Sequence, residues 1–109
     1  MGLTKSAIFT QQQNKLAGTM KALAHPARIA IIQQLLKAEH CICGELVEVL
    51  GLAQATVSQH LLELKKAGII KGCASGTCIS YCIDEKGWEK MKSSFDSIWQ
   101  NPLKTNSCG

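Results

Sequence analysis

The sequence of 109 residues predicts one small, mainly helical domain with a single β-hairpin near its end, on the basis of three observations. Apolar residues recur at helical spacing through most of the chain. A glycine separates a short helical segment from a long one, and one later stretch alternates apolar and polar residues. Hydrophobic residues make up 46 % of the chain and charged residues 18 %, a composition that excludes wholesale disorder.

Two helices are predicted on either side of a proline. From Gln11 to Leu23, the apolar residues Leu16 and Met20 recur at helical spacing. Pro26 breaks this helix and suits the first turn of a second one, which should end near Ala38.

A helix-turn-helix is predicted in the middle of the chain. A short helix carrying Leu46 and Leu50 is ended by Gly51, and the strongest helical pattern follows directly over residues 54–67. Two helices separated by so tight a turn are typical of this motif. The core face of the second helix is defined by apolar residues at i, i+4 and i+7: Val57, Leu61 and Leu64.

The alternating stretch over residues 69–83 predicts the hairpin. Ser75 and Gly76 form a plausible two-residue turn, which places Cys73 directly across from Cys78 and Ala74 across from Thr77. Alternation puts Cys78 and Cys82 toward solvent, away from the apolar face formed by Ile79, Tyr81 and Ile83.

Asp84 can cap a last helix that carries Trp88 and Trp99 and ends at Asn101–Pro102. The complete order of elements is typical of a winged helix-turn-helix, a mainly α fold with a β-hairpin wing. We therefore expect an N-terminal arm over residues 1–10, the winged-helix domain over residues 11–100, and a flexible tail over residues 101–109.

The second helix of the pair has the polar surface that double-stranded DNA recognition needs. Glutamine pairs with adenine, and serine, threonine and lysine reach phosphates or base edges. Three lysines against one glutamate also leave residues 51–83 with a net charge of +2. The predicted DNA-contacting residues are Gln54, Thr56, Ser58, Gln59 and Lys66.

Three segments resemble the ArsR/SmtB family of bacterial repressors: residues 24–29 (AHPARI), residues 52–61 (LAQATVSQHL) and residues 66–70 (KAGII). The resemblance implies a homodimeric winged-helix repressor that binds an inverted repeat and releases it when a toxic metal or metalloid binds. It implies a dimer interface on the first and last helices, around Leu16 and residues 88–99. The sequence departs from the family at Ala53, which lacks the usual capping hydroxyl, and at Leu62, which is apolar near the DNA side.

Six cysteines without a secretion signal are expected to be reduced thiols in the cytoplasm. In the arsenical repressors that the chain resembles, the helix before the recognition helix begins with a Cys-x-Cys element, which Cys41 and Cys43 match. Some members add a third cysteine where this chain has Leu46. Thiolates prefer soft centres, so the expected inducer is As(III) or Sb(III), with no resident cofactor. Helical residues two apart point about 200° apart, so binding is expected to unwind this turn.

Several alternatives stay open at this point. The third ligand is expected from an exogenous molecule or from another cysteine: Cys73, Cys78, Cys82 or Cys108. A thiol redox or persulfide sensor, or a Cd/Zn/Pb sensor that also uses His40, would have the same fold. A cysteine-nucleophile enzyme would need an anion cradle or a base beside the thiol, which His25, His40 and His60 do not provide, so the chain is not expected to be an enzyme. No apolar run approaches the roughly 20 residues that cross a bilayer.

Overall fold

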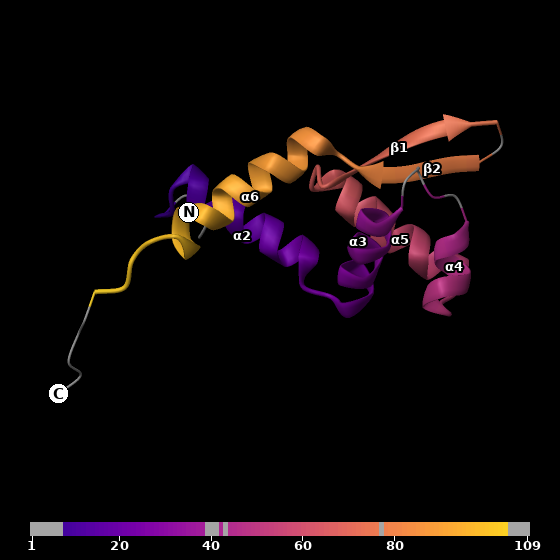
Figure 1. The fold of residues 1–109 in the computed structure, drawn as a ribbon, viewed down its shortest axis with the longest axis horizontal. Coiled ribbons are helices and arrows are strands. Elements are labelled where there is room, and N and C mark those ends of the chain that lie inside the picture. Colours follow the sequence, from indigo (N-terminus) through magenta and orange to yellow (C-terminus); the bar gives the residue numbers. More distant parts are fainter. Residues whose placement is uncertain (1–7, 39–41, 43, 77, 105–109) are drawn as a thin grey trace, which may run out of the picture.

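The computed structural model describes residues 8–38, 42, 44–76 and 78–104, and it has the predicted winged-helix order of elements (Figure 1). The predicted arm and tail fall partly outside the described residues. Within the described part, no helix is long and apolar enough to cross a membrane. The helices are α2 (Gln11–Leu23), α3 (Pro26–Lys37), α4 (Glu45–Leu50), α5 (Gln54–Lys66) and α6 (Glu85–Trp99), and the strands are β1 (Ile70–Ser75) and β2 (Cys78–Ile83).

The helices begin and end where local chemistry dictates. Thr10 and Gln13 form a capping box at the start of α2, which satisfies two backbone N–H groups. Pro26 occupies the first turn of α3, and Gly51 ends α4 with a φ of 67°. Asp84 caps α6 by accepting a hydrogen bond from the Gly87 N–H at 3.0 Å. The predicted Pro26, Gly51 and Asp84 boundaries are therefore confirmed.

The core forms where α3, α4, α5 and the base of the hairpin meet. The predicted core face of α5 is confirmed, since Val57, Leu61 and Leu64 are all buried. Leu64, Ile31 and Ile70 are among the most deeply buried side chains and bring together α5, α3 and β1. This core holds the helix-turn-helix and the wing in one unit.

The helices α2 and α6 pack against each other beside that core (Figure 1). From here on, this helix pair is called the arm, as distinct from the predicted N-terminal arm of residues 1–10. None of the thirteen residues of α2 is fully buried, although Leu16 and Met20 lie on its apolar side. At the end of α6, Ile98 and Trp99 remain 45 % and 64 % exposed. The arm thus keeps apolar surface that the single chain does not cover.

The hairpin turn lies one residue later than predicted. Strand pairing continues to Ser75 opposite Cys78, so the turn begins at Gly76 rather than at Ser75, and Cys73 pairs with Ser80. The predicted Cys73–Cys78 pairing is therefore wrong. The physical reason is Gly76, whose φ of 62° suits the first position of a tight hairpin turn, where serine would be strained.

Candidate nucleic-acid interface and sensing segment

The predicted DNA-contacting side chains all lie exposed on α5 or at its start. Ala53 is the N-cap residue and makes no side-chain capping bond, as the sequence predicts. Leu62 is 44 % exposed, which adds an apolar group to this surface. The predicted residues found exposed in this way are Gln54, Thr56, Ser58, Gln59 and Lys66.

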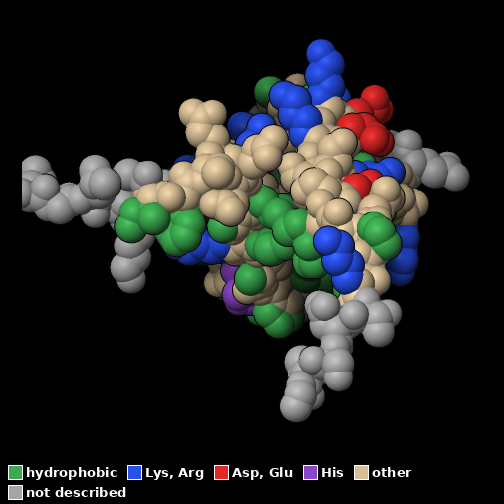
Figure 2. All heavy atoms as spheres, turned by 90° about the vertical axis from the view of Figure 1, so that its left-hand side faces the viewer, with side chains coloured by type: hydrophobic (Ala, Val, Ile, Leu, Met, Phe, Trp, Pro, Cys, Tyr) green, Lys and Arg blue, Asp and Glu red, His purple; other side chains and the backbone are tan. Residues whose placement is uncertain are grey.

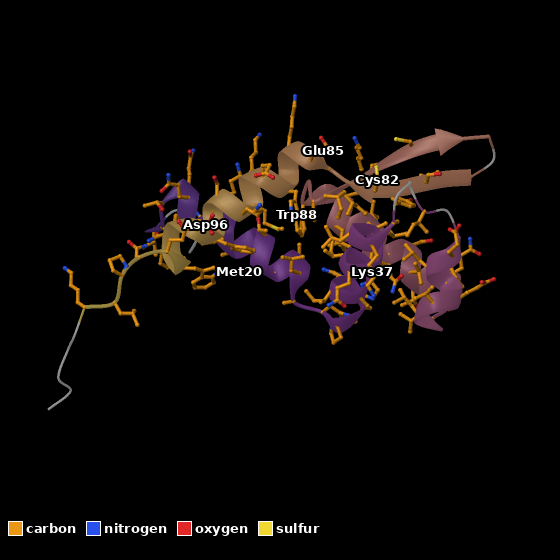
Figure 3. All side chains as sticks on the ribbon, in the orientation of Figure 1. Met20, Lys37, Cys82, Glu85, Trp88 and Asp96 are labelled. Carbon is orange, nitrogen blue, oxygen red and sulfur yellow. The ribbon has the colours of Figure 1, made fainter. Side chains whose placement is uncertain are left out.

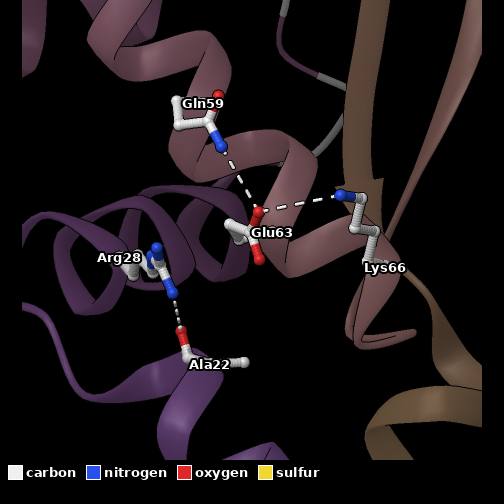
Figure 4. A network of polar contacts seen from close by, with 5 residues as sticks. All are labelled: Ala22, Arg28, Gln59, Glu63 and Lys66. Atoms are coloured by element: carbon white, nitrogen blue, oxygen red, sulfur yellow. Dashed lines mark hydrogen bonds and ion pairs between the residues drawn. The ribbon is translucent and has the colours of Figure 1, made fainter.

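Glu63 connects two of these residues, and the sequence analysis did not single it out. Its Oε1 atom accepts a hydrogen bond from Gln59 Nε2 at 3.3 Å and lies 3.8 Å from Lys66 Nζ (Figure 4). Because the lysine is 64 % exposed, solvent screens this ion pair and it contributes little to stability. Lys66 is therefore only loosely held by Glu63, and its ammonium group can turn toward another anion.

A buried histidine joins α5 to α3. His60 is 8 % exposed, its Nδ1 accepts a hydrogen bond from Arg28 Nε at 3.0 Å, and its ring centroid lies 4.4 Å from that of His25. Arg28 Nη1 also donates to the Ala22 carbonyl at 3.0 Å, which connects α2 to the same cluster (Figure 4). The Arg28 side chain therefore fixes α2, α3 and α5 relative to one another. His60 falls on the core face of α5, three residues after Val57, and this spacing is the signal that could have identified it.

Burial, followed by the nearby His25 and Arg28, lowers the pKa of His60 below its usual 6.5. The folded chain therefore binds this proton less readily than the unfolded chain does. Stability is full above the unfolded pKa and is lost as the pH falls toward the folded one. We expect urea melts to show a steeper loss of unfolding free energy between pH 7 and pH 5 in the wild type than in His60→Asn.

Asparagine keeps an acceptor near Arg28 and cannot titrate in this range. The comparison therefore depends on how steeply the free energy of unfolding changes with pH, and not on its absolute value. Parallel curves would mean that His60 does not titrate as inferred.

The segment before α4 is joined to the wing. Ile42 N–H donates to the Tyr81 carbonyl at 2.9 Å, and Tyr81 N–H donates back to the Ile42 carbonyl at 2.8 Å. Helix α4 begins only at Glu45, after Gly44 in the left-handed region with a φ of 86°. The expectation of a helical turn through this motif is therefore wrong at Ile42, because Gly44 interrupts the helix and Ile42 pairs as a strand residue.

Cys41 and Cys43 themselves lie outside the described residues, as do His40 and Cys108. Leu46, at the position of the third family cysteine, is 3 % exposed and belongs to the core. In the wing, Cys73 is an exposed free thiol and Cys82 is half-buried. Among the described residues, no three His, Cys, Asp or Glu side chains come together as a metal site.

A groove of about 320 Å³ lies between Ile42, α5 and the wing. Its lining includes Ile42, Gln54 and Ser58 together with Ile79 and Tyr81 of β2. Two of the predicted DNA-contacting residues thus share a surface with the residue between the two motif cysteines. A shift of Ile42 would therefore change the shape of the groove next to the start of α5.

Comparison with known proteins identifies the class to which this fold belongs. Residues 25–71 match the family described as bacterial regulatory protein, arsR family. The chain is 34 % identical over 84 residues to the HTH-type transcriptional regulator MJ1325 of Methanocaldococcus jannaschii, covering 75 % of this chain and 93 % of the relative. The chain belongs to the ArsR family of transcriptional regulators.

Two further proteins illustrate the likeness. The HTH-type transcriptional repressor SmtB of Mycobacterium tuberculosis is 47 % identical over 62 residues, which cover 57 % of this chain but only 45 % of SmtB. The crystal structure of a "possible transcriptional regulator for arsenical resistance" superposes with a TM-score of 0.66 at 27 % identity, covering 75 % of this chain and 84 % of that one. The chain thus spans about half the length of some curated relatives that it matches. These relatives are named as regulators, in line with the prediction that the chain is not an enzyme.

Proposed function

We propose that the protein is a homodimeric transcriptional repressor that binds an inverted-repeat operator and releases it when As(III) or Sb(III) binds Cys41 and Cys43. The observation that carries this proposal is the polar, exposed face of α5 in a helix-turn-helix followed by a wing. The ligands must be reduced thiols, so the proposed place of action is the cytoplasm. The inducer is a ligand, and no resident cofactor is required.

Operator recognition would use both the helix and its surroundings. Gln54 and Gln59 offer amides that suit adenine edges, and Thr56, Ser58 and Lys66 suit phosphates or neighbouring base edges. A dimer would present two copies of α5 to half-sites about one helical turn apart. The inverted repeat follows from the two-fold symmetry of such a dimer.

The arm supports the homodimer. Helix α2 has no fully buried residue, and α6 leaves Ile98 and Trp99 exposed beside it. Figure 2, which looks at the molecule from the arm end of Figure 1, shows hydrophobic side chains gathered on that face. A second copy of the same surface would cover these groups, as in an isologous interface.

The inducer is inferred from the chemistry of the motif. Thiolates bind soft centres, and one structurally similar protein is described as a regulator for arsenical resistance. The backbone pairing of Ile42 with Tyr81 offers a route by which binding at its two neighbours moves the wing and the groove beside α5. A ligand that favours a form with lower DNA affinity must, by linkage, release the operator.

Cys43→Ser is expected to abolish release by arsenite and leave operator affinity unchanged, because the ligand loses a thiolate while the DNA surface keeps its residues. The measurement is fluorescence anisotropy of labelled operator DNA, titrated separately with As(III), Cd(II), Zn(II) and peroxide. Cys73→Ser, the same substitution at an exposed wing thiol, is the matched control and should respond like the wild type.

Operator release by arsenite in Cys43→Ser would refute the proposed ligand. Release of the wild type by peroxide, or by Cd(II) or Zn(II) alone, would favour a redox or divalent-metal sensor on the same fold. Failure of the wild type to bind any inverted repeat would refute the repressor function itself.

A further inference from the structure

A second hollow lies between α2, the start of α3 and the end of α5, away from the groove beside the wing. Its volume is about 690 Å³. Figure 4 shows four of its lining residues, Ala22, Arg28, Glu63 and Lys66, where these helices meet. We call this hollow the basic furrow. Its lysine, arginine and carboxylate side chains are Lys15, Lys21, Arg28, Glu63 and Lys66.

The furrow is basic because four cationic side chains surround a single carboxylate. That carboxylate, Glu63, lies 3.8 Å from Lys66 Nζ, and Arg28 is held inside the protein by its two hydrogen bonds. Lys15 and Lys21 are both exposed, and no ion pair between described residues engages either of them. These two lysines of α2 are therefore available to an anion from outside the chain.

Helix α2 presents its basic side and its apolar side in different directions. Lys15, Thr19 and Ala22 recur at i, i+4 and i+7 and line the furrow. Leu16 and Met20 each follow one of these residues directly, so they point about 100° further round the helix. Figure 3 labels Met20 on α2. A dimer that buries the apolar side of α2 can therefore leave the furrow open.

We propose that the basic furrow holds the sugar-phosphate backbone of the operator and that Lys15 and Lys21 contact its phosphates, an inference that rests on the proposed function. The furrow is continuous with the polar face of α5, because Lys66 belongs to both and Glu63 joins Lys66 to Gln59. A duplex lying along α5 would therefore reach the α2 side of the furrow. In the proposed dimer α2 would lie near the two-fold axis, so these phosphates would be those between the two half-sites.

The chemistry of the furrow favours a DNA backbone over a single small anion. Among the described residues, no buried polar side-chain atom lacks a hydrogen-bond partner, so the furrow offers no preformed socket for one small ligand. Lysine carries a point charge on a flexible stem and neutralises phosphates without a fixed geometry. Phosphate contacts orient a protein on DNA and carry no sequence information directly. Lys15 and Lys21 should therefore contribute affinity, whereas the base-reading residues of α5 supply the preference for the operator.

The test measures how DNA affinity depends on salt in the double variant Lys15→Gln, Lys21→Gln of the full-length protein. Fluorescence anisotropy gives the affinity for the operator and for a scrambled duplex of equal length, between about 50 and 200 mM potassium chloride. Each lost phosphate contact makes the plot of log affinity against log salt shallower by about 0.9, so a dimer lacking four lysines should lose about 3.6. Both duplexes should be bound more weakly by the same factor, roughly tenfold or more.

The matched control is the double variant Lys92→Gln, Lys104→Gln, which removes the same charge from exposed lysines outside the furrow and should keep the wild-type slope. Circular dichroism and sedimentation check that both variants fold and assemble like the wild type. A wild-type slope in the furrow variant, or an equal change in both variants, would overturn the inference while the wild type still prefers the operator. A wild type with no preference for any inverted repeat would instead refute the proposed function.

Discussion

Replacing Gly87 by alanine is expected to lower the free energy of unfolding by about 3 kcal/mol, the upper part of the usual range for overpacking. A Cβ atom at this position would overlap the carbonyl of Gly68, where the start of α6 meets the turn between α5 and β1. The atoms that the Cβ would meet belong to the Gly68 backbone, so no side chain can rotate away to relieve the contact. Loss of 3 kcal/mol is a large part of the 5–15 kcal/mol typical of a folded domain.

Gly18→Ala is the matched control, because it makes the same substitution inside a helix with the opposite expected sign. No atom lies within 4 Å of a Cβ built on Gly18, and alanine favours a helix interior by up to about 1 kcal/mol. Urea denaturation at equal protein concentration measures both variants. Stabilisation by both substitutions would show that α6 can move away from Gly68 at little cost.

Trp99→Ala is expected to weaken dimerisation by about 1,000-fold. Trp99 is 64 % exposed on α6, with its ring centroid 6.4 Å from that of Phe95. A buried interface tryptophan typically contributes about 2 kcal/mol or more to binding. Because a two-fold dimer contains the substitution in both chains, the free energy of dimerisation should weaken by about 4 kcal/mol. Sedimentation equilibrium over a range of concentrations measures the dissociation constant.

Val49→Ala controls for the removal of exposed apolar surface elsewhere, because Val49 is 55 % exposed on α4, away from the arm. Its dissociation constant should match the wild type. Equal dissociation constants for Trp99→Ala and the wild type, or a wild type that stays monomeric at all concentrations, would contradict the proposed interface.

The helices could be predicted because their signals are local. Pro26, Gly51 and Asp84 each act on the backbone within a turn of their own position, so the sequence alone locates them. The apolar spacing of Val57, Leu61 and Leu64 likewise depends only on helical geometry. The polar face of α5 follows from the same periodicity, which is why its five residues are found exposed.

The contacts that could not be predicted join distant parts of the chain. Ile42 is a single apolar residue between two cysteines and carries no period, so nothing local indicates that it pairs with Tyr81. Arg28 and His60 are 32 positions apart, and only the fold brings them together. Local signals misplace the hairpin turn by one residue, because Ser75–Gly76 and Gly76–Thr77 are both typical turn sequences. Only the full pairing of β1 with β2 decides between them.

The double hydrogen bonding of Arg28 has a consequence for the length of DNA that the protein can span. Its guanidinium holds the Ala22 carbonyl near the end of α2 and the His60 ring on α5. In the proposed dimer, α2 would lie beside the symmetry axis and α5 in the major groove, so Arg28 would set the angle between the symmetry axis and α5. The distance between the two operator half-sites would then be set inside each chain, by a residue that need not touch a base.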